Sequence, residues 1–127
     1  MIAVIFEVIP APGAMQDYLE HAKRLRVLLE GFDGFISIER FQSLTDPNKL
    51  VSLSFWRDEA AVTSWRKHPE HRTTQAAGRY GIFTDYRLRV AEVERDYGLF
   101  ERAQAPQHHA DVSPSTAACP MMPSGLW

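Results

Sequence analysis

Two histidines in the middle of the chain, His68 and His71, have the residue type and the spacing for chemistry. They lie three positions apart around Pro69, so a helix that begins there would place both imidazoles on one face. They could be metal ligands, surface or helix-capping residues, or parts of a substrate pocket. A metal site needs three or four ligands and the first 98 residues add only His21, so we predict no metal centre. In a pocket, His71 would act as the base that removes a proton from a phenol-like or enol-like substrate.

Other side chains around these histidines also have two interpretations. Trp65 is either a core residue or a lid over a ligand. Gln75 and Arg79 lie four positions apart and could present an amide and a guanidinium to an anionic substrate, although Arg79 could instead offset the helix dipole near a helix C-terminus. Tyr18 and Tyr86 could donate hydrogen bonds into a cavity, or pack in the core.

The elements that must position these residues follow from hydrophobic periodicity. Alternating apolar residues predict strands, and apolar residues at three- and four-residue steps predict helices. Asp58 is the expected N-cap of the second helix, and a turn at Thr45–Asn48 joins the second and third strands as a hairpin. The predicted elements, in order, are a strand at Ile2–Ile9, a helix at Ala14–Glu30, strands at Phe35–Ser43 and Lys49–Trp56, a helix at Glu59–Trp65 continued at an angle by His68–Gly78, and a strand at Ile82–Tyr97.

This order, β-α-β-β-α-β, predicts an α+β fold of the ferredoxin-like, split βαβ type, a four-stranded antiparallel sheet with helices on one face. We expect residues 1–98 to form this domain, and the proline-rich residues 99–127 to be an extended or disordered tail that could pack on a dimer partner. The other sheet face would expose apolar side chains such as Val4, Phe6, Phe41 and Tyr86 or their pleat neighbours. We therefore predict a homodimer joined through this open sheet face.

The same order, together with the segment from Ser54 to Gly98, resembles the antibiotic-biosynthesis monooxygenase superfamily of dimeric α+β barrels. The stretch WRKHPEH that begins at Trp65, followed by Gln75, Gly78-Arg79 and Asp85-Tyr86, is similar to the fingerprint of one bacterial branch. The resemblance implies a monooxygenase that oxygenates a small aromatic or polycyclic substrate without a tightly bound organic cofactor. The predicted catalytic residues are His71, Trp65 and Gln75, and the predicted substrate-binding residues are His68, Arg79, Tyr86 and Tyr18.

Haem binding with oxidative opening of the ring is an alternative that the resemblance also implies. Haem-degrading members have an Asn on the first strand, a Trp on the second helical segment and an iron-ligating His about ten residues later. Trp65 matches the Trp, but Glu7 stands in place of the Asn and Gln75 in place of the His. His71 lies one helical turn before Gln75 and could still reach a metal. A non-catalytic ligand-binding or stress-related dimer is a further alternative.

Composition excludes several other classes of function. The 127 residues carry 14 Lys and Arg against 16 Asp and Glu, a formal charge of -2, which argues against nucleic acid as the main partner. The apolar stretches are far shorter than the ~20 residues of a membrane span, and neither a phosphate-binding loop nor a dinucleotide fingerprint is present. The start of the chain lacks the pattern of a signal peptide, and Cys119 is the only cysteine. We expect a cytoplasmic protein with a small-molecule substrate and no membrane contact.

Overall fold

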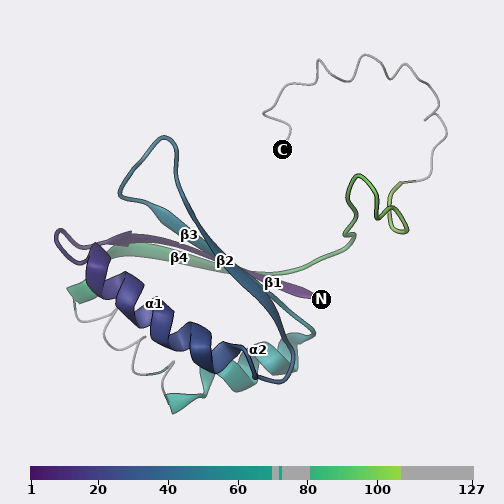
Figure 1. The fold of residues 1–127 in the computed structure, drawn as a ribbon, viewed down its shortest axis with the longest axis horizontal. Helices are drawn as coiled ribbons and strands as arrows, with labels where there is room; N and C mark the ends of the chain where they lie inside the picture. The colour runs from purple at the N-terminus through teal and green to yellow at the C-terminus, as the bar shows by residue number, and fades with distance from the viewer. Residues whose placement is uncertain (70–71, 73–80, 107–127) are drawn as a thin grey trace. The chain divides into compact units, whose positions relative to one another are not determined.

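The computed structural model describes residues 1–69, 72 and 81–106, and Figure 1 shows its ribbon. Its elements follow the predicted order with ends that differ by at most one residue, except in the last strand. They are β1 (Ile2–Pro10), α1 (Met15–Leu29), β2 (Phe35–Gln42), β3 (Leu50–Trp56), α2 (Glu59–Arg66) and β4 (Phe83–Glu92). Most of the predicted helix at His68–Gly78 lies outside the described residues, as does the end of the tail.

The four strands form one antiparallel sheet in the order β2-β3-β1-β4. β3 lies between β1 and β2, so the first β-α-β unit is split by a third strand, as the ferredoxin-like prediction requires. Figure 1 shows α1 and α2 on the same side of the sheet. The predicted α+β fold is confirmed. No helix in the described ranges is long and apolar enough to cross a membrane.

The last strand is shorter than predicted, because β4 ends at Glu92 rather than near Tyr97. Its partner β1 begins at Ile2, which pairs with Glu92, and the Val93 amide then donates to the Met1 carbonyl (2.9 Å). The β1–β4 ladder ends there, although the apolar alternation of the sequence continues.

Contacts divide the chain into two units, Met1–Val93 and Glu94–Trp127. In the described part of the second unit, one backbone hydrogen bond and one side-chain hydrogen bond close a short loop. The Gly98 amide donates to the Glu101 carbonyl (2.8 Å), and the Asp96 amide donates to the Gln104 side chain (2.8 Å). The Arg102 guanidinium lies 5.4 Å from the centre of the Tyr97 ring.

The structure decides which side chains of β1 and β4 face outward. Val4, Phe6 and Tyr86, which were named together with their pleat neighbours as candidates for the outer face, line a cavity under the helices, so their neighbours face outward. Phe41 is 44% exposed and pairs with Val51 on the other face, as predicted. Both faces of β1 carry apolar side chains, so alternation alone does not decide which face the helices cover.

An ion-pair cluster of Glu7, Lys49 and Arg89 lies on the open face of the sheet. Glu7 accepts from Lys49 (2.9 Å) and from Arg89, and these two cations hold the pKa of the Glu7 carboxyl below its usual range, with Lys49 contributing most. Arg89 on β4 and Glu7 on β1 thus form a cross-strand ion pair. It places Glu7 on the face opposite the cavity, because its neighbour Phe6 lines the cavity.

The start of α2 is tied to the turn that precedes β2. The Asp58 side chain accepts from the Ala61 amide (2.9 Å), which confirms the predicted N-cap and lowers the pKa of Asp58, as does Arg57 to a smaller degree. The Arg57 guanidinium donates to both carboxylate oxygens of Asp33 (3.0 and 3.1 Å), and the Arg57 amide donates to the Gly34 carbonyl (2.7 Å). These contacts fix the position of α2 relative to the sheet edge.

Two apolar clusters make up the core. One is centred on Trp56 and Trp65, which are 2% and 6% exposed, and joins α1, α2, β1 and β3. The other is centred on Val8, which is fully buried, with Tyr18 and Leu50 around it. The space between the two clusters is not filled by side chains.

Candidate functional site

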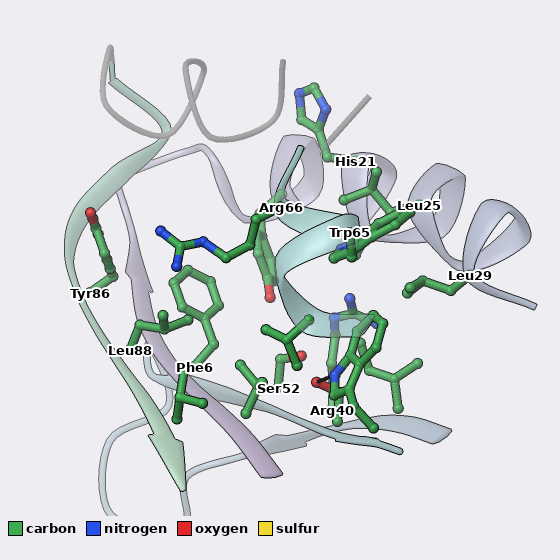
Figure 2. A pocket seen from close by; sticks show the side chains of 18 of the residues that line it. Phe6, His21, Leu25, Leu29, Arg40, Ser52, Trp65, Arg66, Tyr86 and Leu88 are labelled. Carbon is green, nitrogen blue, oxygen red and sulfur yellow. Dashed lines mark hydrogen bonds between the residues drawn. The ribbon is translucent and has the colours of Figure 1, made fainter. Parts of the chain in front are cut away.

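A cavity of about 300 Å³ lies between the helix-covered face of the sheet and the two helices. This volume is at the lower end of the range that small-molecule sites occupy, roughly 300–1,000 Å³. Figure 2 shows the cavity from close by, with Phe6 and Leu88 on one side, Trp65 opposite and Ser52 on the sheet. The lining residues are Val4, Phe6, Tyr18, His21, Ala22, Leu25, Leu29, Ile38, Arg40, Ser52, Ser54, Trp56, Val62, Trp65, Arg66, Phe83, Tyr86, Leu88 and Val90.

Small side chains in the middle of β3 leave the room for this cavity. Leu50, Ser52, Ser54 and Trp56 alternate toward the helices, and all four are buried. Large apolar residues fill the space at both ends of this row, whereas the two serines at its centre do not reach the helices. The Ser54 hydroxyl accepts from the Trp56 indole nitrogen (2.9 Å), which satisfies one buried donor on the cavity floor.

Aromatic rings form the wall of the cavity on the β4 side. The Phe6 and Tyr86 ring centres lie 5.6 Å apart, and Phe83 packs edge-on against both Phe6 (5.7 Å) and Tyr18 (5.8 Å). Tyr18 is 5% exposed, but Tyr86 is 51% and Leu88 47% exposed. Among the described residues, most of the β4 side chains that line the cavity are thus exposed to solvent, whereas Trp56 and Trp65 on its other wall are buried.

Three basic side chains line the otherwise apolar cavity. Arg40 extends from β2, Arg66 from α2 and His21 from α1. Figure 2 shows the Arg66 side chain reaching over Phe6, and the His21 ring pointing away from the cavity. Arg24 donates to Nδ1 of His21 (2.9 Å).

The structure brings three of the seven predicted site residues together. Trp65, Tyr18 and Tyr86 all line the cavity, from three different elements. Trp65 combines both of its interpretations, because it is a buried core residue and a wall of the cavity. His68 is half-buried and packs against the rings of Trp65 (5.2 Å) and Phe32 (6.4 Å), but it does not belong to the lining.

The other predicted site residues, His71, Gln75 and Arg79, lie outside the described residues, so their roles remain predictions. Conversely, sequence reasoning missed Arg40, Arg66 and the paired serines of β3. The serines could have been found, since they alternate in register with Leu50 and Trp56. Arg40 could have been found through its partner, because it pairs across the hairpin with Ser52.

The described residues offer no group of three or more His, Cys, Asp or Glu side chains that could hold a metal ion. Among them, His21 is the one histidine that lines the cavity, and its ring points outward and contacts Arg24. An iron porphyrin needs an axial ligand directed into its pocket. His71, the predicted haem ligand, lies outside the described residues, so the haem alternative stays a prediction.

Fold and cavity together define a small α+β domain with an apolar, basic-lined ligand pocket. A family model for antibiotic biosynthesis monooxygenases matches residues 1–77 of this chain. The chain belongs to the antibiotic biosynthesis monooxygenase family, as its sequence predicted.

Two curated proteins and one solved structure are similar to this chain. It is 47% identical over 93 residues to a protein named jasmonate monooxygenase ABM from Pyricularia oryzae, covering 73% of this chain but 43% of that protein. It is 30% identical over 93 residues to YqjZ of Bacillus subtilis, covering 73% of this chain and 79% of that one. The structure of Rv0793 from Mycobacterium tuberculosis superposes with a TM-score of 0.69 at 18% identity, covering 76% of this chain and 98% of that one. This last likeness shows the fold, and the chain spans less than half of the Pyricularia protein.

Proposed function

We propose that this chain is a monooxygenase that holds a small, largely apolar substrate in the cavity between the sheet and the helices. The cavity is the observation that supports the proposal: it is lined mainly by aromatic and aliphatic side chains, with Trp56 and Trp65 buried on one wall and exposed Tyr86 and Leu88 on the β4 side. Family membership and the name of the Pyricularia relative favour oxygenation over simple binding. A cyclopentanone carboxylate such as jasmonate and a polycyclic aryl ketone are the first two substrate types to test.

The reaction that suits such a pocket draws its electrons from the substrate. A base removes a proton from a C–H bond activated by a neighbouring carbonyl or phenol-like ring, and the carbanion reduces O₂ and forms a C–O bond. Protonation gives a hydroperoxide, whose O–O bond breaks with loss of water and leaves a carbonyl group, so that CH₂ plus O₂ becomes C=O plus H₂O. In this scheme His71 is the base, and Trp65 and Tyr18 shield the carbanion from water. Gln75 completes the proposed catalytic set, and Arg79 and Tyr86 position the substrate. His68 acts through Trp65, on whose ring it packs.

The test of this proposal is oxygen uptake by the purified chain without added flavin, nicotinamide or metal. We expect one O₂ consumed per substrate and a product that has gained one oxygen and lost two hydrogens. His71→Ala should lower the rate by about 100-fold or more, because a positioned base contributes roughly 10²–10⁴-fold. The melting temperature of this variant should stay close to that of the parent.

His21→Ala is the matched control, because the His21 ring points away from the cavity, and it should keep the parent rate. Substrate binding without oxygen uptake would contradict the monooxygenase proposal and favour a ligand-binding dimer. A saturable Soret shift with hemin that His71→Ala abolishes would favour the haem alternative instead.

We also propose that the chain acts as a homodimer through the open sheet face. We propose a cytoplasmic location as well, because a single cysteine is typical of proteins from a reducing compartment. This face carries half-buried Ile5, Leu53 and Phe55 beside the exposed Phe41. Leu53 pairs with Ile5 on one side and Glu39 on the other, near the middle of the face.

Leu53→Lys should weaken the dimer by about 100-fold or more, because burying an unpaired charge costs several kcal/mol. Sedimentation velocity at a series of concentrations measures this change. Val27→Lys, on α1 and 70% exposed, is the control and should leave the dimer intact. A parent chain that sediments as a monomer would refute the dimer.

A further inference from the structure

We propose that Arg40 binds the carboxylate of the ligand, so that this cavity takes an apolar monoanion with its acid group on the β2 side. The inference rests on the proposed use of the cavity as the substrate site and names the substrate class. Arg40 lies on β2, its side chain lines the cavity, and it pairs across the hairpin with Ser52, whose side chain lines the cavity too. The cation and a hydroxyl thus lie side by side on the cavity floor.

One nitrogen of the Arg40 guanidinium, Nε, is removed from water without receiving a partner. This atom is fully buried and has no hydrogen-bond partner in the described part of the chain, the only such buried side-chain nitrogen or oxygen there. Arg40 as a whole is half-buried, so the rest of the side chain retains some exposure. A desolvated cation without an anion is unfavourable, and an incoming carboxylate relieves this cost.

Nothing acidic in the described lining can serve as that anion. The lining contains Arg40 and Arg66 but no Asp or Glu. The carboxylates of Glu7, Asp33 and Asp58 are paired with other cations, namely Lys49 and Arg89 for Glu7, and Arg57 for the two aspartates. An apolar cavity with positive charge and no internal counter-charge is complementary to a ligand with an apolar body and one negative group.

Arg40 is a better anchor than Arg66, the other cation of the lining. The Arg66 side chain is exposed and keeps its water, so an ion pair there gains little. Arg40 is held between the sheet and the helices, where a charge-assisted hydrogen bond is stronger because the surroundings are less polar. A guanidinium also matches the two oxygens of a carboxylate in its fork geometry.

The experiment measures binding rather than turnover. Isothermal titration compares jasmonate with its primary amide, and 1-naphthoate with 1-naphthamide, because each amide keeps the shape of its acid and removes the charge. The parent chain should prefer the acid by about 10-fold or more in at least one pair. Arg40→Gln should bring that ratio close to one by weakening the acid and sparing the amide, whereas Arg66→Gln should keep most of the preference.

Arg26→Gln, an exposed arginine in the last turn of α1 and outside the lining, is the matched control and should keep the full ratio. The melting temperature of Arg40→Gln should stay close to that of the parent or exceed it, since the change removes a partly desolvated charge whose buried Nε has no partner in the described part of the chain. If no pair is discriminated, or if Arg66→Gln abolishes the preference and Arg40→Gln does not, the inference is wrong. Acid preference without oxygen uptake would support the role of Arg40 and refute the monooxygenase proposal. Oxygen uptake without acid preference would refute the role of Arg40 and support the monooxygenase proposal.

Discussion

Replacing Trp65 with alanine should lower the free energy of unfolding by about 3–5 kcal/mol, the range for deleting a large aromatic residue from a core. Trp65 is 6% exposed and belongs to the cluster around Trp56. Its ring centre lies 5.2 Å from that of Phe32 and 6.4 Å from that of Trp56. Urea unfolding followed by circular dichroism, at one fixed protein concentration, measures the loss.

Trp65→Phe is the matched control, because it keeps an aromatic ring in the cluster and removes only part of the volume. It should cost less than half of what Trp65→Ala costs and should still weaken ligand binding, since Trp65 also lines the cavity. A Trp65→Ala variant that is as stable as the parent would show that Trp65 is a lid and not a core residue. The two sequence interpretations of this residue are thereby separated.

Much of the fold was predictable from sequence, because periodicity reports directly on secondary structure. The Thr45–Asn48 turn and the Asp58 cap marked the ends of elements, and the structure confirms that cap. The covered face of β1 was not predictable, since Val4 and Phe6 alternate with the equally apolar Ala3 and Ile5. Only the side on which the helices pack decides between such faces.

The candidate site was less predictable than the fold. Trp65 was predicted because a large aromatic residue beside a helix end is a candidate for a core role and for a pocket role alike. Arg40 was missed because an arginine in an alternating strand usually points to solvent. Its position under the helices depends on the register between β2 and β3, which pairs it with Ser52. The register of the predicted hairpin, with its turn at Thr45–Asn48, would have placed Arg40 beside Ser52 and on the same face.

Replacing Gly34 with alanine should cost about 2–5 kcal/mol of unfolding free energy, because two independent penalties combine there. Gly34 has a φ of +88°, a left-handed conformation that costs a residue with a Cβ roughly 1–2 kcal/mol. A Cβ at Gly34 would also lie 2.4 Å from the Cβ of Ala61 in α2, and overpacking of this kind costs about 1–3 kcal/mol. Urea unfolding measures the sum.

Gly13→Ala separates the two penalties. Gly13 has a φ of +79°, but a Cβ there would meet no atom within 4 Å, so only the backbone cost of about 1–2 kcal/mol applies. Adding Ala61→Gly to Gly34→Ala removes the overlap, and the double-mutant cycle should therefore show a favourable coupling energy. If Gly34→Ala costs no more than Gly13→Ala, the close approach of the turn to α2 is absent in solution.

The same close approach links stability to the site. Gly34 touches α2 at Ala61 and accepts from the Arg57 amide, and α2 carries Trp65 and Arg66 into the cavity. A Cβ at Gly34 must push the start of α2 away from the turn, and the helix transmits this shift to both side chains because it moves as a rigid element. Gly34→Ala should thus weaken ligand binding more than Gly13→Ala does, even at a temperature where both variants are fully folded. Titration of the two variants with the same ligand measures the difference, and equal affinities would show that α2 absorbs the shift before Trp65.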